Sequence, residues 1–517
     1  MPALSSFNLP FRPVPNLPFR PNQNYVQFRK ELETMDDILQ RSGLDEFMLQ
    51  QALEKRESEK SDPAAFQRGL EAFIKQARTA FRVSILRALK GCDPVRSLEI
   101  SLADSELERW FCFIDNFDQV RSPSKSSIDR YKNMFGPDAP QKAFEMLLQK
   151  AASSPENYDS SIESAINILG YETPPNLLEV WYDSTCLNLN IHFPVDWVQL
   201  GSCCKSLLHS ISTIRNHGIL NRMPKGTDDL LNELNKISIE LGNARRRKDS
   251  RTKRKEVFRR LKKFSNRVAN HARKHMELLV KNREEKTTLS EAQATHIIER
   301  MEDILKQLPE VKRVANERII GERKVPSNEK IISPFETSAK IMVRGKSGAE
   351  VEFGNQLMIG ENRDGLIVFY ELYEEVKSDS KLYIEAIEKT EETVGSTLEL
   401  ICGDRGYSDI KTQAQIVESR PDLKDHTCPK SVDLLQKALA EPEFRRSQKR
   451  RCQSEGRIAI LKHVYQRGKT LSKGIDSQGL ELSWVMLTHN LRKLAQMRIL
   501  EENNREQARK EEIREAS

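Results

Sequence analysis

Apolar residues recur every three or four positions along most of the first third of the chain, a spacing that predicts amphipathic helices. The clearest series consists of Phe66, Leu70, Phe73, Ala77, Phe81 and Ile85. Gly91 follows this series and is a natural helix end. We therefore predict a helical domain over residues 24–175. The preceding residues 1–23 hold six prolines and the repeated sequence NLPFRP, which predicts an extended arm.

Helical spacing returns between about residues 200 and 322. An apolar stripe within this block consists of Val257, Leu261, Phe264 and Val268. Basic side chains alternate with the stripe, so they should form the opposite, solvent-facing side of one helix. Thr288 and Glu291 have the spacing of a capping box and predict the start of another helix. We predict a basic helical insertion over residues 201–324.

Strand signals flank this insertion. They are Leu177–Ser184, Val351–Ile359, Leu366–Leu372 and Leu398–Gly403. The sequence GENRDG between the second and third predicts a hairpin turn. Helical patterns then resume at 408–419, 431–439 and 444–467, and a charged tail covers 496–517. The predicted fold class is therefore α/β, with strands drawn from about 176–200 and 325–495.

Length and composition limit the number of domains and the class of protein. A chain of 517 residues has room for two to four domains that fold without disulfides. The eight cysteines form no CxxC pair, which argues against structural zinc. The apolar runs are too short to cross a bilayer, and the start lacks a signal segment, so we expect a soluble cytoplasmic protein.

Charge is concentrated in the predicted insertion. Residues 245–274 contain 15 Lys and Arg against two acids, although the whole chain carries only +7. Such a block can be a solvated helix face, but this density favours contact with a polyanion, and we predict DNA. The candidate DNA-binding residues are Arg245, Arg246, Arg247, Lys253, Arg254, Arg259, Arg260, Lys262, Lys263 and Arg267.

Two of the predicted strands end in an aspartate: VWYDST contains Asp183, and LICGDRGY contains Asp404. Each alone could accept a local hydrogen bond or cap a helix. The two are separated by the whole insertion, so they can meet only if their strands are neighbours in one sheet. Ligands bind at such strand ends in open α/β sheets.

A third acid, Glu455, lies in the predicted helix 444–467, seven residues before Lys462. In an α-helix this spacing places both on one face, about 10 Å apart. Three carboxylates can hold two Mg²⁺ (or Mn²⁺) ions, which take oxygen ligands and support phosphodiester cleavage. We therefore predict Asp183, Asp404 and Glu455 as metal ligands and catalytic residues, and Arg451 and Lys462 as DNA contacts.

These motifs resemble the bacterial insertion-sequence transposases of the DDE class. The similar segments are DSTCLNLNIHFPVDW from Asp183, VEFGNQLMIGENRDGLIVFYEL from Val351 and GDRGY around Asp404. Arg451, Glu455 and Lys462 fit the family's Tyr, Arg, Glu, Lys spacing, whereas Gln448 stands where tyrosine is expected. ERWFCFIDNFDQVRSPSKSSIDRY and WVMLTHNLRKL are similar to the family's N-terminal and closing helical segments.

The resemblance implies a ribonuclease-H-like catalytic domain at 176–200 and 325–495, which is preceded in the chain by a DNA-binding domain at 24–175. It also implies a homo-oligomer, expected to be a dimer, that acts on transposon terminal inverted repeats in the bacterial nucleoid. Water would free a 3′-hydroxyl, which would attack target DNA, without a small-molecule cofactor. Two alternatives remain open: a catalytically silent DNA-binding protein derived from a transposase, and a related nuclease without strand transfer.

Overall fold

The chain forms two compact units in a computed structural model. One unit is Met1–Leu187 with Gln356–Ser517, and the other is Asn188–Asn355. The structure describes residues 12–59, 66–92, 94–114, 121–155, 166–191, 194–244, 250–282, 286–326, 329–346 and 349–515. The second unit is thus larger than the insertion predicted at 201–324, and the predicted N-terminal and catalytic segments share the first unit.

The first unit begins with a set of helices, as the periodicity predicts. They are α1 (Gln23–Ser42), α2 (Leu44–Glu59), α4 (Leu70–Leu89), α5 (Val95–Asp104), α6 (Glu106–Phe111), α7 (Lys125–Tyr131) and α8 (Ala139–Ala151). Ala77, Phe81 and Ile85 of the predicted stripe are buried in α4. The helix ends at Leu89, two residues before the left-handed Gly91, whose φ is +77°. Burial of this stripe holds the helices together.

The proline-rich arm packs onto these helices where the structure describes it. Arg12 donates to Asp36 at 2.8 Å, and its guanidinium lies 3.8 Å from the Phe113 ring centre. Trp110 Nε1 donates to the Arg12 carbonyl at 3.2 Å. The first eleven residues of the predicted arm lie outside the described residues, and these contacts concern only its second half.

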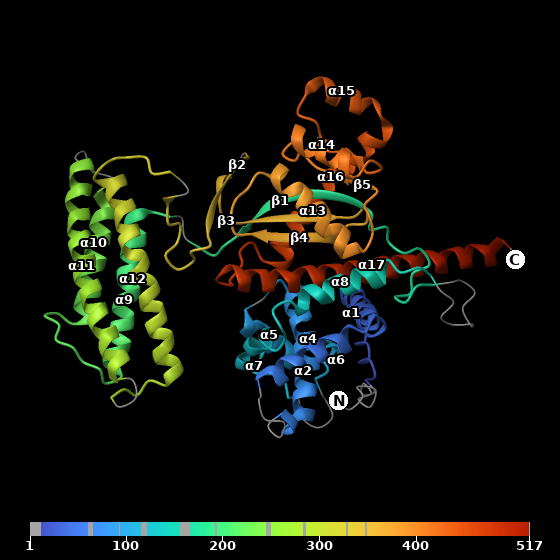
Figure 1. Cartoon of the computed structure of the whole chain (residues 1–517). Coiled ribbons are helices and arrows are strands. Elements are labelled where there is room, and N and C mark those ends of the chain that lie inside the picture. The colour runs from blue at the N-terminus through green and yellow to red at the C-terminus, as the bar shows by residue number, and fades with distance from the viewer. Residues whose placement is uncertain are drawn as a thin grey trace. The chain divides into compact units, whose positions relative to one another are not determined.

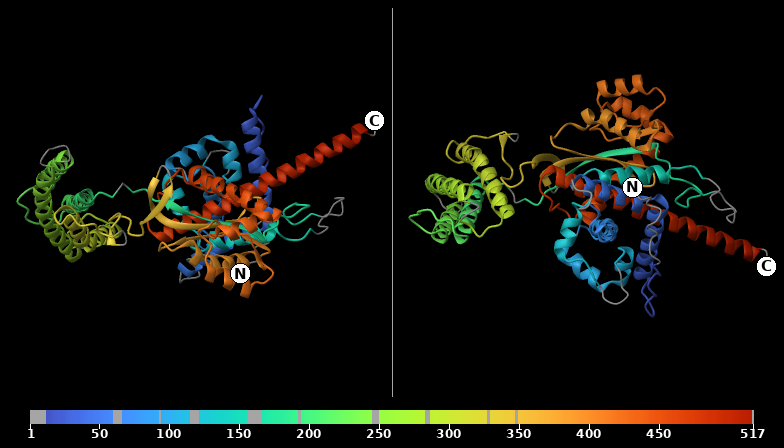
Figure 2. Two further views of the ribbon diagram at one scale, coloured as in Figure 1. Left: turned by 90° about the horizontal axis from the view of Figure 1, so that it is seen from above. Right: turned by 60° about the horizontal axis from the view of Figure 1, so that its bottom comes forward.

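The long helix α17 (Ile475–Glu515) connects the helices to the sheet. It packs against α1, α4 and α8 and also against strand β4. Figure 1 shows α17 passing between the sheet and the N-terminal helices, and Figure 2 shows its long C-terminal part from two further sides. The predicted tail 496–517 continues this helix, and Arg498 within it donates to Asp37 at 2.5 Å. The tail is therefore partly packed.

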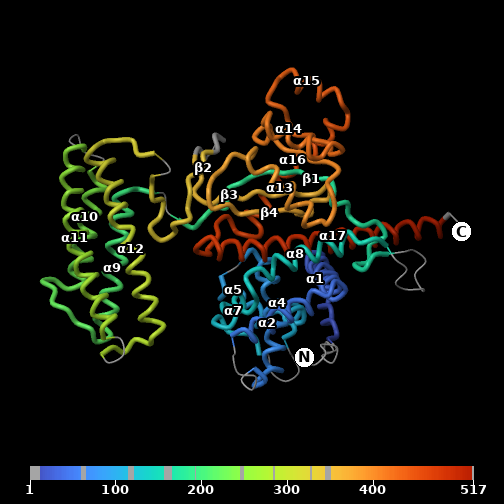
Figure 3. Tube along the Cα trace, viewed as in Figure 1, coloured from blue at the N-terminus to red at the C-terminus, as the bar shows by residue number. Residues whose placement is uncertain are grey.

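The sheet is mixed, and its strands are β1 (Glu179–Asn188), β2 (Lys340–Lys346), β3 (Ala349–Glu361), β4 (Ile367–Tyr373), β5 (Leu400–Cys402) and β6 (Lys424–Asp425). The order is β2-β3-β1-β5-β6, and β4 also pairs with β3. The β3–β4 hairpin at GENRDG is confirmed, and its course is followed in Figure 3. Strands β1, β5 and β6 are parallel. Strands β2 and β6 were not predicted from the sequence.

Helices cover both faces of the sheet in the first unit. Val180, Tyr182 and Ile401 belong to the main core, together with apolar residues of α13 (Asp379–Val394). Trp181, Leu400 and Cys402 form a separate cluster on the other face. The helix α16 (Pro442–Ile460) covers this second face, where its Ser447 carbonyl accepts from Trp181 Nε1 at 2.9 Å. The alternation of strand side chains thus sends neighbouring residues to different helices.

Two shorter helices, α14 (Ile410–Ser419) and α15 (Val432–Ala440), lie between β5 and α16 in the chain. The helix α16 continues into one π-helical turn, η3 (Leu461–Tyr465). The helices predicted at 408–419, 431–439 and 444–467 are therefore confirmed, with shifted ends.

The second unit is built on α9 (Asp196–Asn216), α10 (Thr227–Ala244), α11 (Ser250–Asn282) and α12 (Glu291–Ile319). The predicted stripe Val257, Leu261, Phe264 and Val268 is buried in their shared core. The predicted capping box at Thr288 and Glu291 is wrong. Ser290 and Gln293 form it instead, two residues further along the chain. Among the described helices of the chain, none is long and apolar enough to cross a membrane.

Candidate active site

The two predicted aspartates occupy equivalent places on neighbouring strands. Strands β1 and β5 pair in parallel, with Glu179 opposite Leu400 and Trp181 opposite Cys402. Two residues further along each strand come Asp183 and Asp404. Strand β5 ends at Cys402, so Asp404 lies just beyond its carboxyl end, whereas β1 continues to Asn188 and Asp183 lies within it. The prediction that the strand around Asp183 ends at this aspartate is therefore wrong. The parallel pairing still aligns the two residues with each other. The prediction that these strands are neighbours is confirmed.

Each aspartate also makes the local contact that a purely structural role would give. Asp183 Oδ1 accepts from the Ser184 amide at 2.8 Å, and Asp404 Oδ1 accepts from the Gly406 amide at 2.6 Å. Asp404 does not cap α14, because Asp409 accepts from the first amides of that helix. Each carboxylate can still bind a further ligand, since an ionised carboxylate has about four acceptor positions.

A third acid, Asp379, lies next to Asp404 and was not predicted as a site residue. A Cβ atom on Gly406 would lie 2.9 Å from Asp404 Oδ1 and 3.2 Å from Asp379 Oδ2, so both carboxylates flank this glycine. Asp379 is the first residue of α13, and its Oδ1 accepts from Gln356 Nε2 at 3.1 Å. The first turn of a helix favours a negative charge.

Tyr407 is buried beside these acids. Its side chain has no exposed surface, and its hydroxyl has no hydrogen-bond partner in the described part of the chain. Burial raises the pKa of Tyr407 well above its usual value, and the charges of Asp379, Asp183 and Asp404 raise it further. All three carboxylates are therefore within electrostatic reach of one neutral hydroxyl, which can donate a hydrogen bond.

The predicted glutamate approaches from α16. Gln448 on this helix donates to the His426 carbonyl at 2.7 Å and to the Gly403 carbonyl at 3.4 Å, directly before Asp404. Arg451 Nε donates to Gln448 Oε1 at 3.2 Å. Glu455 follows Gln448 by seven residues, so it lies two turns along the same side of the helix and is exposed. Gln448 thus anchors α16 to the end of β5.

Lys462 does not continue this α-helical face. It lies in η3, where the π-helical turn replaces regular α-helical geometry after Ile460. The prediction that Glu455 and Lys462 project from one face of a continuous α-helix is therefore wrong. Lys462 is half-buried, and the π-helical turn changes the direction in which it projects relative to Glu455.

A buried ion-pair cluster fixes the other side of α16. Glu361, at the end of β3, has no exposed surface. It accepts from Ser454 Oγ at 2.6 Å, from Arg450 at 3.1 Å and from Arg457 at 3.0 Å. Burial alone would raise the pKa of Glu361, but the hydrogen bond and charge of Arg450 lower it. The cluster orients the helix that carries Glu455.

Carboxylates are suitable ligands for a hard cation, and two of the three predicted ones are aligned with each other. Asp183 and Asp404 bring oxygen ligands, which Mg²⁺ prefers, to neighbouring strands. A complete ligand set is not present: among the described residues, no three His, Cys, Asp or Glu side chains are close enough together to hold a metal ion. Asp183 and Asp404 fit the predicted role by position, whereas Glu455 is not brought to bonding distance of both.

The predicted basic ridge on α11 is largely engaged by neighbouring side chains. Arg260 pairs with Glu240 and Arg267 with Glu233, each at 2.6 Å. Lys253 contacts Glu256, and Lys262 donates to Asn316, each at 2.9 Å. Arg254 also has an interaction.

Two ridge residues differ from the rest. Arg259 and Lys263 are exposed and have no ion pair with the described residues. They lie one turn apart on α11, so both can reach the same ligand. Arg245, Arg246 and Arg247 lie outside the described residues.

The chain matches no protein-family model, no curated protein and no solved structure.

Proposed function

We propose that the chain is a DNA transposase that cleaves transposon ends and joins the freed 3′-hydroxyl to target DNA. The observation that carries the proposal is the parallel register of β1 and β5, which aligns Asp183 within β1 with Asp404 just beyond the end of β5. Together with the resemblance of the motifs around Asp183, Asp404 and Glu455, this supports a ribonuclease-H-like core. The chain would act as a homodimer on two ends.

The three acids come from different elements around the proposed site. Asp183 and Asp404 come from the sheet, and Glu455 comes from α16, which Gln448 and Glu361 anchor. Bound Mg²⁺ would supply charge neutralisation at the scissile phosphate and lower the pKa of a water. Glu455 is exposed and lies two turns from the Gln448 contact, so its carboxylate is open to DNA on the surface of α16.

Two exchanges at phosphorus make up the reaction. In the first, a water oxygen bonds to phosphorus, the bond to the 3′-oxygen breaks, and a 3′-hydroxyl is released. In the second, this 3′-hydroxyl bonds to a target phosphate and displaces a target 3′-oxygen, which takes up a proton. One phosphodiester replaces another in the second step, so no external energy source is needed.

A strand-transfer assay tests the proposal. Full-length protein is mixed with a pre-cleaved end duplex, supercoiled plasmid and Mg²⁺, using end sequences taken from the DNA that flanks the coding region. We expect joined product from the wild type and none from Asp183→Asn or Asp404→Asn. Asp422→Asn is the matched control, because Asp422 is an exposed turn residue.

The assay separates the proposal from its alternatives. Cut plasmid without joined product would assign the chain to nucleases without strand transfer. A stable protein–DNA complex with no reaction would assign it to catalytically silent DNA-binding proteins. Either result, obtained with protein shown to be folded by circular dichroism, contradicts the proposed function.

A further inference from the structure

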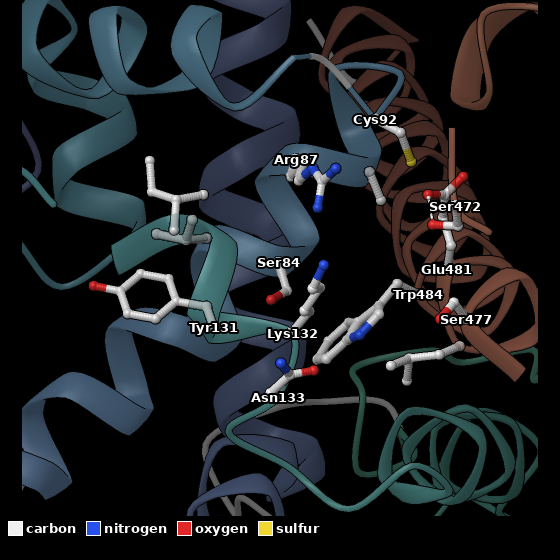
Figure 4. Close-up of a pocket in the computed structure, with 14 residues that line it drawn as sticks. Ser84, Arg87, Cys92, Tyr131, Lys132, Asn133, Ser472, Ser477, Glu481 and Trp484 are labelled. Carbon is white, nitrogen blue, oxygen red and sulfur yellow. Dashed lines mark hydrogen bonds between the residues drawn. The ribbon is translucent and has the colours of Figure 1, made fainter. Parts of the chain in front are cut away.

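A pocket lies where α4, α7 and α17 meet in the first unit. Its cavity volume is about 90 Å³. None of Asp183, Asp379, Asp404 and Glu455 lines it. Figure 4 shows side chains from the three helices around this space. One water needs about 10 to 15 Å³ of such space, so the pocket has room for a compact small molecule.

Two hydrogen-bond donors in this pocket have no acceptor. Arg87 Nε on α4 and Trp484 Nε1 on α17 are both buried, and neither has a partner among the described residues. The Trp484 side chain is only 6% exposed. Buried donors are almost always satisfied in folded proteins, so two orphan donors on one pocket wall indicate a missing acceptor. The donors come from different helices, and one ligand could satisfy both.

The polar part of the pocket is positively charged. In Figure 4 the Arg87 guanidinium and the Lys132 ammonium point toward the same part of the space. Lys132 is half-exposed and lies 3.5 Å from Asp129, a contact at the surface. Glu481 also lines the pocket, but its two oxygens accept from Thr470 at 2.8 Å and Ser472 at 2.6 Å. These hydroxyls leave the negative charge of Glu481 in place, so the pocket is lined by two cations, Arg87 and Lys132, and by one anion. An anionic group of a ligand can pair with the two cations.

The remaining walls are apolar. Val83, Ile128 and Leu480 line the pocket beside the Trp484 ring. Behind that ring, Phe81 and Phe135 pack at centroid distances of 6.1 and 5.8 Å, which fixes the indole in place. A ligand that fills this space would therefore carry an apolar body as well as an acceptor group.

We infer that this pocket binds a small organic anion in which one carboxylate or phosphate group is attached to an apolar body. The anionic group accepts hydrogen bonds from Arg87, Lys132 and Trp484, and the body packs on Val83 and Leu480. The orphan donors are buried, so a compact molecule can reach them and the phosphates of a DNA duplex cannot. The inference does not rest on the proposed DNA chemistry.

Titration of the full-length protein with defined probes tests this inference. Benzoate carries the carboxylate, phenyl phosphate carries the phosphate, and inorganic phosphate lacks the apolar body. We expect at least one of the first two to bind with a Kd below about 1 mM, and inorganic phosphate to bind at least about tenfold more weakly. Calorimetry measures affinity, and tryptophan emission reports the environment of Trp484.

Variants assign the binding to the pocket. Arg87→Gln should weaken binding by about tenfold or more, because it removes a charged donor. Trp484→Phe keeps an aromatic ring but removes the donor, and should weaken binding by about fivefold. Lys132→Gln, at a half-exposed position that tolerates substitution, should weaken it as well. Lys125→Gln on the same helix is the control and should change nothing, since Lys125 is exposed outside the pocket.

Three results would overturn the inference. The first is no binding of either organic probe to the wild type at about 10 mM, which lies well above any specific affinity. The second is unchanged affinity in folded Lys132→Gln and Arg87→Gln. The third is displacement of the probe by a short DNA duplex, which would assign the pocket to nucleic acid.

Discussion

Among single residues, Tyr407 is the one whose surroundings are hardest to explain by folding alone. Its hydroxyl is buried without a partner, beside Asp183, Asp379 and Asp404. A hydroxyl in this position gains a partner when a water or a substrate oxygen enters between the acids. Tyr407 would then position that oxygen, and the fold would carry an unsatisfied donor only while the site is empty.

Tyr407→Phe should therefore lower strand transfer while leaving the fold intact. We expect activity to fall by about tenfold, the usual effect of losing a group that orients a ligand shell. The free energy of unfolding should stay equal or rise by about 1 kcal/mol, because an unpaired buried hydroxyl is removed. Strand-transfer rates and urea unfolding of the same preparation provide both readouts.

Tyr383→Phe is the matched control. Tyr383 packs against Tyr407 at 4.9 Å between ring centroids, but its hydroxyl already bonds to Thr427 at 2.9 Å. Its loss should reduce stability with little change in rate. Equal rates for Tyr407→Phe and the wild type would show that the Tyr407 hydroxyl has no part in the reaction.

His489 predicts how stability depends on pH. It is buried, and its Nε2 lies 3.2 Å from the Gly365 carbonyl. Burial, and then the charge of Arg457, lower the pKa of His489 to about 3. The unfolded chain binds a proton below about pH 6.5 and the folded chain does not, so stability should fall by about 1.4 kcal/mol per pH unit in this range.

Urea unfolding at about pH 7 and about pH 5 measures this dependence. His489→Asn removes the titrating group and can still donate to the Gly365 carbonyl, so its stability should change less between the two conditions. If the variant and the wild type lose stability equally, another group is responsible for the pH dependence.

On the scale of elements, the attachment of α16 to the sheet decides where Glu455 lies. Glu361→Gln removes the charge that Arg450 and Arg457 share, and leaves two guanidinium groups beside a neutral amide. We expect a loss of about 3 to 5 kcal/mol in the free energy of unfolding, as for other buried pairs that lose one partner. Strand transfer should fall too.

Glu441→Gln, at an exposed position just before α16, is the control for this change.

The stabilisation that Glu361 contributes to the fold also depends on pH. Its pKa is lowered in the folded chain, so its stabilisation is present above the usual carboxyl pKa and is lost as pH falls. Unchanged stability of Glu361→Gln would contradict an anchoring role for this cluster.

Elements with strong periodicity could be predicted from the sequence. The apolar stripe of α11 and the β3–β4 hairpin have local signals, and both are confirmed. Strands β2 and β6 could not be predicted, because pairing with neighbours distant in the chain decides such short segments. The capping box was misplaced because Thr288 and Ser290 offer similar hydroxyls, and only the helix start selects between them.

The residues of the site also divide into those that the sequence could predict and those that it could not. Asp183 and Asp404 were identifiable because each follows an apolar run, which is a local pattern. That β1 continues past Asp183 could not be predicted, because the two residues after it are polar and interrupt the apolar run. Asp379 and Tyr407 reach the same place only through the packing of α13 and of the turn after β5. The π-helical turn at Lys462 likewise has no sequence signal in its regular helical spacing.

On the scale of the whole molecule, the proposed contact of the second unit with DNA predicts how binding should depend on salt. Most cations of α11 are paired with acids or amides, and Arg259 and Lys263 are exposed. Arg259→Ala with Lys263→Ala should lower the slope of log affinity against log salt by about 2, one for each phosphate contact. Arg260→Ala is the control and should change the slope less.

Fluorescence anisotropy on a short duplex at several salt concentrations gives these slopes. An unchanged slope in the double variant would place DNA on another surface of the chain.

Mn²⁺ binding to the full-length protein, followed by electron paramagnetic resonance, tests the central claim most directly. If Asp183 and Asp404 share one cation, each Asn variant should weaken Mn²⁺ binding by about tenfold or more. The double variant should then be little worse than either single one, and Asp422→Asn should bind as the wild type does. Absence of Mn²⁺ binding by the wild type, or undiminished binding by both single variants, would contradict the account.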